Sequence, residues 1–202
     1  MIQAKLLHQQ HFESLIGPEA ARTLCAPTAL YACAQLAGYE LPAPETYVGK
    51  LNRKDWSPTT CGWSRAGLSG MLRDYDMPVV SWHTSETGRP QDQPSIDAMR
   101  VAGYIATTEE ESFLRNVVMQ SSLVEIAQAI PVVITVTPGF AHNRAHHAVL
   151  ITDVAENGDS FTIFDPDSES PLTTASRDHL EKHLDTRGAC TIILPAVPGT
   201  TE

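Results

Sequence analysis

The stretch CAPTALYACAQLAG, residues 25–38, contains the clearest helix pattern in the first half of the chain. Alanine, leucine and glutamine favour helices, and Gly38 stands where a helix would end. Pro27 has no backbone N–H, so a helix tolerates it only in the first turn, where that donor would have no partner. The sequence therefore predicts a helix that begins at or just before Cys25.

Helical patterns also dominate the rest of the first half. Residues 64–75 (SRAGLSGMLRDY) have the apolar spacing of an amphipathic helix, and MPVVSW, residues 77–82, is typical of a short strand. Residues 40–63 are rich in proline, which favours a loop with a short helical turn. Residues 109–130 are expected to be helical, in one piece or two.

The second half changes to strand patterns. Four segments are apolar and rich in β-branched residues: 131–136, 147–154, 160–165 and 191–194. Asn157-Gly158 is a strong hairpin signal between the second and third of them. This segregation predicts one α+β domain over residues 1–202, in which the N-terminal helices pack on a C-terminal antiparallel sheet.

Composition and charge exclude several classes of function. The 202 residues carry a formal net charge of -10, which argues against a nucleic-acid partner because a phosphate backbone calls for a basic surface. No run approaches the roughly 18 apolar residues that cross a bilayer. The first residues are polar where a signal peptide would be apolar. We therefore predict a cytoplasmic protein with no membrane partner and no cofactor.

The four cysteines, at positions 25, 33, 61 and 190, do not have the spacing of a zinc site. In a reducing compartment we expect free thiols and no disulfide. Cys25 and Cys33 are separated by about 12 Å of helical rise, beyond the roughly 7 Å between Cα atoms that a disulfide spans. Cys33 and Cys190 are expected in the core.

Cys25 is the candidate nucleophile. A cysteine attacks as the thiolate, which a helix N-terminus and a neighbouring imidazolium both stabilise. His147 stands at the head of a strand, and Asp165 ends the strand that the hairpin pairs with it. Residues equally far from a hairpin turn lie opposite each other, so both fall near one level. The expected roles are Cys25 as nucleophile, His147 as base and Asp165 as the residue that orients the imidazole.

Each candidate has a plainer alternative. Cys25 could be a small buried residue at a helix start, and Asp165 could serve only an Asp-Pro turn. His142 and His146 have a spacing that binds metal on a helix, so a metal-dependent hydrolase that uses them with His147 is an alternative. They stand in a predicted loop, however, and His146 is expected at the surface.

Three motifs together resemble a known family. They are CAPTAL at Cys25, IPVVITV followed by HHAVLITDV, and FTIFDPDSE. In this order they are similar to papain-like cysteine peptidases, in the branch of bacteriocin-processing (double-glycine leader) peptidases. The resemblance implies a papain-like fold with the catalytic set Cys25, His147 and Asp165. It also implies a bacterial cysteine-nucleophile hydrolase or acyl-transfer enzyme that acts on a peptide or amide bond through a thioester.

One position departs from that family. Its members usually carry a glutamine about six residues before the cysteine, whose amide completes the oxyanion hole. This chain has Glu19 there, and a carboxylate cannot donate a hydrogen bond. Other possible donors are Gln9, Gln10, Arg22 and Thr23. The alternative function is therefore a catalytically impaired papain-like module that binds peptides.

Overall fold

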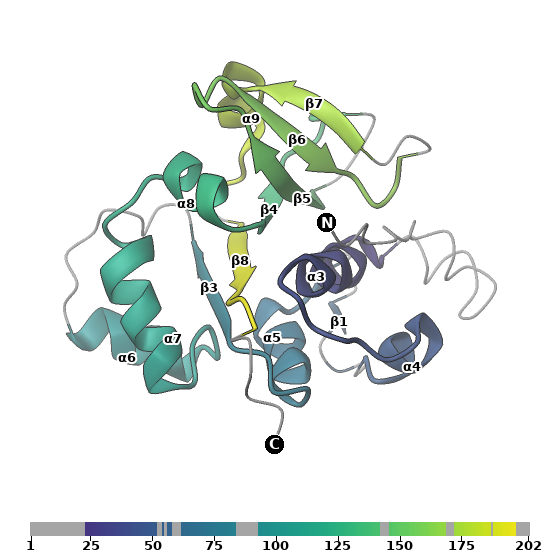
Figure 1. Cartoon of the computed structure of the whole chain (residues 1–202). Coiled ribbons are helices and arrows are strands. Elements are labelled where there is room, and N and C mark those ends of the chain that lie inside the picture. The colour runs from purple at the N-terminus through teal and green to yellow at the C-terminus, as the bar shows by residue number, and fades with distance from the viewer. Residues whose placement is uncertain are drawn as a thin grey trace.

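An antiparallel sheet forms the centre of the computed structural model, which describes residues 23–51, 54, 56–57, 62–83, 93–141, 146–168, 172–186 and 188–196 (Figure 1). Within those residues the sheet has six strands in the order β3-β8-β4-β5-β6-β7, all antiparallel to their neighbours. The strands are β3 (Val79–His83), β4 (Val132–Val136), β5 (His147–Val154), β6 (Ser160–Phe164), β7 (Leu172–Ser176) and β8 (Ala189–Ile193). A separate small pair joins β1 (Trp56–Ser57) to β2 (Gly62–Trp63).

Helices cover both faces of this sheet (Figure 1). One face carries α3 (Cys25–Leu36), α4 (Pro44–Gly49) and α5 (Arg65–Arg73). The other carries α6 (Gln93–Val101), α7 (Thr108–Phe113), the π-helical turn η4 (Leu114–Val118), α8 (Leu123–Ala129) and α9 (Arg177–His183).

The central strands β4 and β5 are buried on both faces. Val133 and Leu150 belong to the apolar cluster beneath α3, whereas Ile134, Val149 and Ile151 belong to the cluster on the opposite face. Successive side chains of a strand point to opposite faces, which is why both strands are almost continuously apolar. This two-sided burial fixes β5, the strand that begins with His147.

The predicted strands are confirmed, with small changes at their ends. Pro131 stays outside β4 because proline has no N–H for the ladder. Asp165 follows β6 instead of ending it. Neither β7 nor α9 was predicted. Four of the five β7 residues are exposed, so this strand lacks the apolar alternation that signals a half-buried strand.

The helical predictions hold as well. Residues 109–130 divide at Ser122, whose hydroxyl accepts from the Glu125 N–H while the Glu125 carboxylate accepts from the Ser122 N–H. This reciprocal cap starts a new helix. The predicted helix at 64–75 is α5, capped by the Ser64 hydroxyl.

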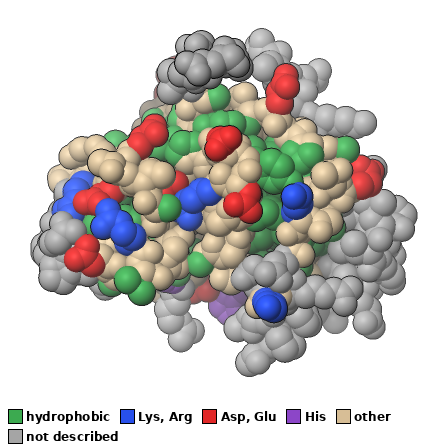
Figure 2. Space-filling model, turned by 90° about the horizontal axis from the view of Figure 1, so that it is seen from below, with side chains coloured by type: hydrophobic (Ala, Val, Ile, Leu, Met, Phe, Trp, Pro, Cys, Tyr) green, Lys and Arg blue, Asp and Glu red, His purple; other side chains and the backbone are tan. Residues whose placement is uncertain are grey.

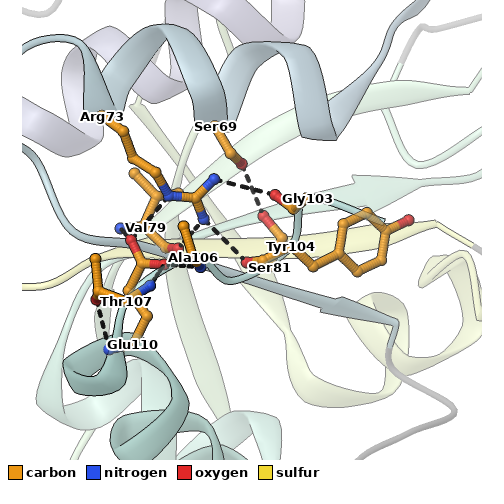
Figure 3. A network of polar contacts seen from close by, with 9 residues as sticks. All are labelled: Ser69, Arg73, Val79, Ser81, Gly103, Tyr104, Ala106, Thr107 and Glu110. Atoms are coloured by element: carbon orange, nitrogen blue, oxygen red, sulfur yellow. Dashed lines mark hydrogen bonds and ion pairs between the residues drawn. The ribbon is translucent and has the colours of Figure 1, made fainter. Parts of the chain in front are cut away.

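A buried ion pair ties α5, β3 and α7 together (Figure 3). Arg73 Nε donates to Glu110 Oε1 at 2.9 Å, and the Glu110 side chain is fully buried. The same Oε1 accepts from the Val79 N–H at 2.7 Å, and Arg73 Nη1 donates to the Gly103 carbonyl at 3.1 Å. Almost every donor and acceptor of Arg73 and Glu110 therefore has a hydrogen-bond partner. A buried ion pair requires such partners to offset the loss of contact with water.

We expect Glu110→Gln to lower the free energy of unfolding by about 3 kcal/mol, because it leaves the Arg73 cation buried without a counter-charge. Chemical denaturation monitored by circular dichroism measures the loss. Glu181→Gln is the control, since the Arg177–Glu181 pair is exposed and should contribute far less. Equal losses in the two variants would contradict a structural role for the buried pair.

Several charged side chains on the outer surface form ion pairs. On the face shown in Figure 2, basic and acidic side chains lie side by side at the end that holds α6 and α7. Arg100 pairs with Asp97 and Glu111, and Arg115 pairs with Glu111. Among the described residues, none of the helices has the length and apolar character needed to traverse a bilayer.

Candidate active site

Cys25 is the first residue of α3. The Thr28 N–H donates to the Leu24 carbonyl at 2.8 Å, so helical hydrogen bonding starts there and Pro27 falls in the first turn. The first N–H groups of a helix have no partner within it and give this end a partial positive charge. A thiolate on Cys25 is stabilised by that charge.

His147 is the first residue of β5, and its imidazole contacts Asp165. Nε2 lies 2.7 Å from Asp165 Oδ1, and both side chains are 9% exposed. Because Leu150 pairs with Phe164, Asp165 lies one step beyond that pair, close to the level of His147. Asp165 Oδ1 also accepts from the Asp167 N–H at 2.9 Å, which fixes the carboxylate.

The turn between β5 and β6 makes this register possible. Gly158 has φ +73°, a conformation that side chains other than glycine rarely adopt, and its N–H donates to the Ala155 carbonyl at 2.8 Å. The Asn157-Gly158 sequence therefore forms the tight turn that brings Asp165 back toward His147.

The thiol of Cys25 lies beside the His147–Asp165 pair, and the three residues together form the candidate catalytic group. It lies close enough to the His147 side chain and to the backbone of Ala148 for both to lower its pKa. Since Nε2 of His147 is engaged by Asp165, Nδ1 is the ring nitrogen left for the thiol. Cys25, His147 and Asp165 therefore lie in succession, with a hydrogen bond between His147 and Asp165 and the Cys25 thiol beside the imidazole.

These contacts shift the pKa values of both partners. Burial raises the pKa of Cys25, but the hydrogen bond and charge of His147, the Ala148 backbone and the Arg65 charge outweigh it and lower that pKa overall. Burial lowers the pKa of His147, but its contacts with Asp165 and Cys25 prevail and raise it to about 10. The two shifts act in the same sense, because each favours the charged form of its group: a thiolate at Cys25 and an imidazolium at His147.

The other described cysteines differ from Cys25 in their burial and in the direction of their pKa shift. Cys33 and Cys190 are fully buried free thiols, and burial raises the pKa of each to about 12. Both are core residues, as the sequence predicts. Cys61 lies outside the described residues. Of the three cysteines described, Cys25 has the lowered pKa.

Arg65, which sequence reasoning missed, lies beside this group. It is the first residue of α5, and its Nη2 donates to Thr135 Oγ1 at 3.2 Å. Thr135 pairs across the sheet with Ala148, whose backbone lies close enough to the Cys25 thiol to lower its pKa. No local pattern signals Arg65, because the packing of α5 on β3 and the hydrogen bond to Thr135 of β4 place it there.

The metal-site alternative gains no support from the described residues. His146 is exposed and its Nδ1 lies 2.8 Å from Asp185 Oδ2, away from the Asp165 partner of His147. In the part of the chain that the structure describes, no group of three or more His, Cys, Asp or Glu side chains is arranged to hold a metal. His142 lies outside that part.

Most candidates for the oxyanion hole also lie outside the described residues: Gln9, Gln10, Glu19 and Arg22. Thr23 is described and partly buried. The backbone N–H of Cys25 lies in the first turn of α3, where the helix itself offers it no acceptor.

A pocket of about 340 Å³ lies beside α5, apart from this group. Its lining includes Lys50, Leu51, Trp63, Met71 and Tyr75 but not Cys25. We therefore do not include the pocket in the candidate active site. Trp63 lines this pocket, whereas Trp82 is buried in the core.

Comparisons with known proteins agree with this architecture. A family model described as "Peptidase_C39 like family" matches residues 1–184. Among solved structures, a Bacillus anthracis protein assigned to the C39-like peptidases is 15% identical, with a TM-score of 0.50 over 96% of each chain. The peptidase domain of Streptococcus ComA, a bifunctional ABC transporter, is 14% identical, with a TM-score of 0.49 over 87% of this chain and 93% of that one.

No curated protein matches. The Bacillus structure and the antiparallel sheet confirm the predicted α+β, papain-like fold.

Proposed function

This chain belongs to the Peptidase_C39-like family, and from that membership we propose that it is a cysteine peptidase in which Cys25 attacks, His147 transfers the proton and Asp165 orients His147. The observation that supports the proposal is the position of His147, which contacts Asp165 at 2.7 Å and lies beside the Cys25 thiol at the start of α3. A cysteine used only for packing needs neither partner, and Cys33 and Cys190 are the examples in this chain.

The reaction follows from the charges. The Cys25 thiolate attacks the carbonyl carbon of a peptide bond, and the carbonyl oxygen becomes an oxyanion. The imidazolium of His147 gives its proton to the amine nitrogen as the C–N bond breaks, which leaves a neutral thioester on Cys25. Neutral His147 then takes a proton from water, whose oxygen attacks the thioester. Collapse releases the carboxylic acid and restores the thiolate and imidazolium.

Asp165 has two effects in this scheme. Its carboxylate keeps the proton on Nε2, so Nδ1 faces the thiol, and it stabilises the imidazolium. The start of α3 also stabilises the oxyanion, because the Cys25 N–H can donate a hydrogen bond to it. Glu19 does not supply the second donor that a glutamine would, which predicts slow turnover.

The alternative, a peptide-binding module that has lost turnover, rests on Glu19. The two functions are separated by incubating the protein with a peptide library derived from a digested proteome and sequencing new termini by mass spectrometry. New termini that depend on Cys25 support the peptidase. Peptides captured without cleavage, by a protein whose Cys25 still reacts rapidly with iodoacetamide, would favour the binding module.

Hydrolysis should persist over a broad range of pH. The lowered pKa of Cys25 keeps the thiolate present below the ordinary thiol value of about 8.5, so the acid limb lies below that value. The pKa of His147, about 10, keeps its proton available for the leaving amine until the pH passes that value. A profile of kcat/KM against pH measures both limbs. An alkaline limb near the ordinary histidine value of about 6.5 would contradict the proposed ion pair.

A further inference from the structure

The guanidinium of Arg65, at the start of α5, is fixed against β4. Its Nη2 donates to Thr135 Oγ1, which itself donates to the Ala189 carbonyl at 3.2 Å. Gly188 lies so close to Thr135 that a Cβ at this glycine would stand 2.5 Å from the threonine Cβ. The threonine side chain is therefore confined, and it holds the guanidinium at one level of the sheet.

That level is the one at which β5 begins. Thr135 pairs across the sheet with Ala148, the residue that follows His147. Side chains of directly paired residues point to the same face of a sheet, and Ala148 belongs to the apolar cluster beneath α3. The backbone of Ala148 lies close to the thiol of Cys25, the first residue of α3. Arg65 and Cys25 are therefore on one face of the sheet, near Ala148.

Arg65 lacks the carboxylate partner that a buried cation requires. None of the ion pairs between described residues includes it, and its Nη1 is buried without a hydrogen-bond partner. Arg73, on the same helix, is instead paired with Glu110 (Figure 3). The first turn of α5 contains no acidic residue either, although the positive end of a helix disfavours a cation. Arg65 thus carries a cost in free energy that packing does not explain.

The acidic groups that interact with the charge of Arg65 are two thiols and a phenol, those of Cys25, Cys190 and Tyr104. Burial raises the pKa of Cys190 to about 12, so this thiol stays neutral. The Tyr104 hydroxyl lies 2.9 Å from His83 Nε2 and is engaged there. Of the two thiols, Cys25 is the one whose pKa is lowered. Its thiolate is the counter-charge that Arg65 otherwise lacks.

We propose that Arg65 is a positioning residue whose permanent positive charge holds the Cys25 sulfur in its anionic form, a proposal that rests on Cys25 being the nucleophile of a peptidase. Burial lowers the pKa of Arg65, but a guanidinium starts so high that it stays protonated near neutral pH. The imidazolium of His147, by contrast, gives its proton to the leaving amine. Arg65 therefore remains charged beside the sulfur of the thioester, and it favours the return of the electron pair to sulfur when the C–S bond breaks.

The test is the rate at which iodoacetamide alkylates Cys25 as a function of pH, followed by mass spectrometry of the peptide that contains this residue. Arg65→Gln keeps a donor for Thr135 but removes the charge. The midpoint of the profile should move to higher pH, and labelling below the wild-type midpoint should slow by about threefold or more. Arg65→Lys should restore part of the difference. Arg65→Gln should also raise the midpoint in a His147→Ala background, because the guanidinium acts on the sulfur directly.

Arg177→Gln is the matched control, because it removes the same charge from an exposed residue of α9 and should leave the midpoint unchanged. Circular dichroism establishes that each variant is folded. If Arg65→Gln moves the midpoint no further than Arg177→Gln, while wild-type Cys25 titrates below a cysteine peptide, the role of Arg65 is overturned and the peptidase proposal stands. A midpoint in Arg65→Lys as high as in Arg65→Gln would overturn it as well, since charge would not be the cause. If wild-type Cys25 titrates like a cysteine peptide, both proposals fail together.

Discussion

Replacing Cys25 with alanine is expected to abolish peptide hydrolysis, with a loss of about 10⁴-fold or more. The reason is that the thiolate forms the covalent intermediate, and no other described thiol lies beside a histidine that is paired with an aspartate. Release of new termini from a cleaved peptide, followed by mass spectrometry, measures the loss. Labelling by an electrophilic peptide ketone should disappear with it.

Cys33→Ala is the matched control for this loss. Cys33 lies on the same helix, is fully buried and has a raised pKa, so its removal should affect packing and leave hydrolysis intact. Circular dichroism establishes that both variants are folded. Hydrolysis that persists in folded Cys25→Ala would show that another group is the nucleophile.

Replacing His147 with alanine should lower hydrolysis by about 10³-fold or more, since both the imidazolium that stabilises the thiolate and the acid that protonates the amine are lost. The comparison variant is His146→Ala. These neighbouring histidines each contact an aspartate, but His147 contacts Asp165 in the buried group whereas His146 contacts Asp185 at the surface. Steady-state kinetics should show a near-normal rate for His146→Ala. Similar rates in the two variants would refute the role of His147.

The fold was predictable because its signals are local. Pro27 restricts where α3 can begin, and β-branched runs mark β4, β5 and β6. The Asn157-Gly158 turn relates two strands that are adjacent in the chain, so the proximity of His147 and Asp165 could be inferred from sequence distance alone. The exposed strand β7 has no such apolar signal and was missed.

The surroundings of Cys25 were less accessible to sequence reasoning. Contact between α3 and β5 joins residues more than a hundred positions apart, and the sequence suggests it only through the resemblance to papain-like peptidases. The position of Arg65 depends on the packing of α5, the tight approach of Gly188 to Thr135 and the pairing of Thr135 with Ala148. None of these contacts has a signature in the residues around Arg65.

The central claim is that Cys25 is a thiolate paired with the imidazolium of His147. Titration of the thiolate ultraviolet absorbance, taken as the difference between the wild-type protein and Cys25→Ser, measures the pKa of this thiol directly. We predict a pKa below the ordinary value of about 8.5, and a rise to about 8.5 or above in His147→Ala, where burial still raises the pKa. A wild-type pKa at or above 8.5 that His147→Ala leaves unchanged would contradict the account.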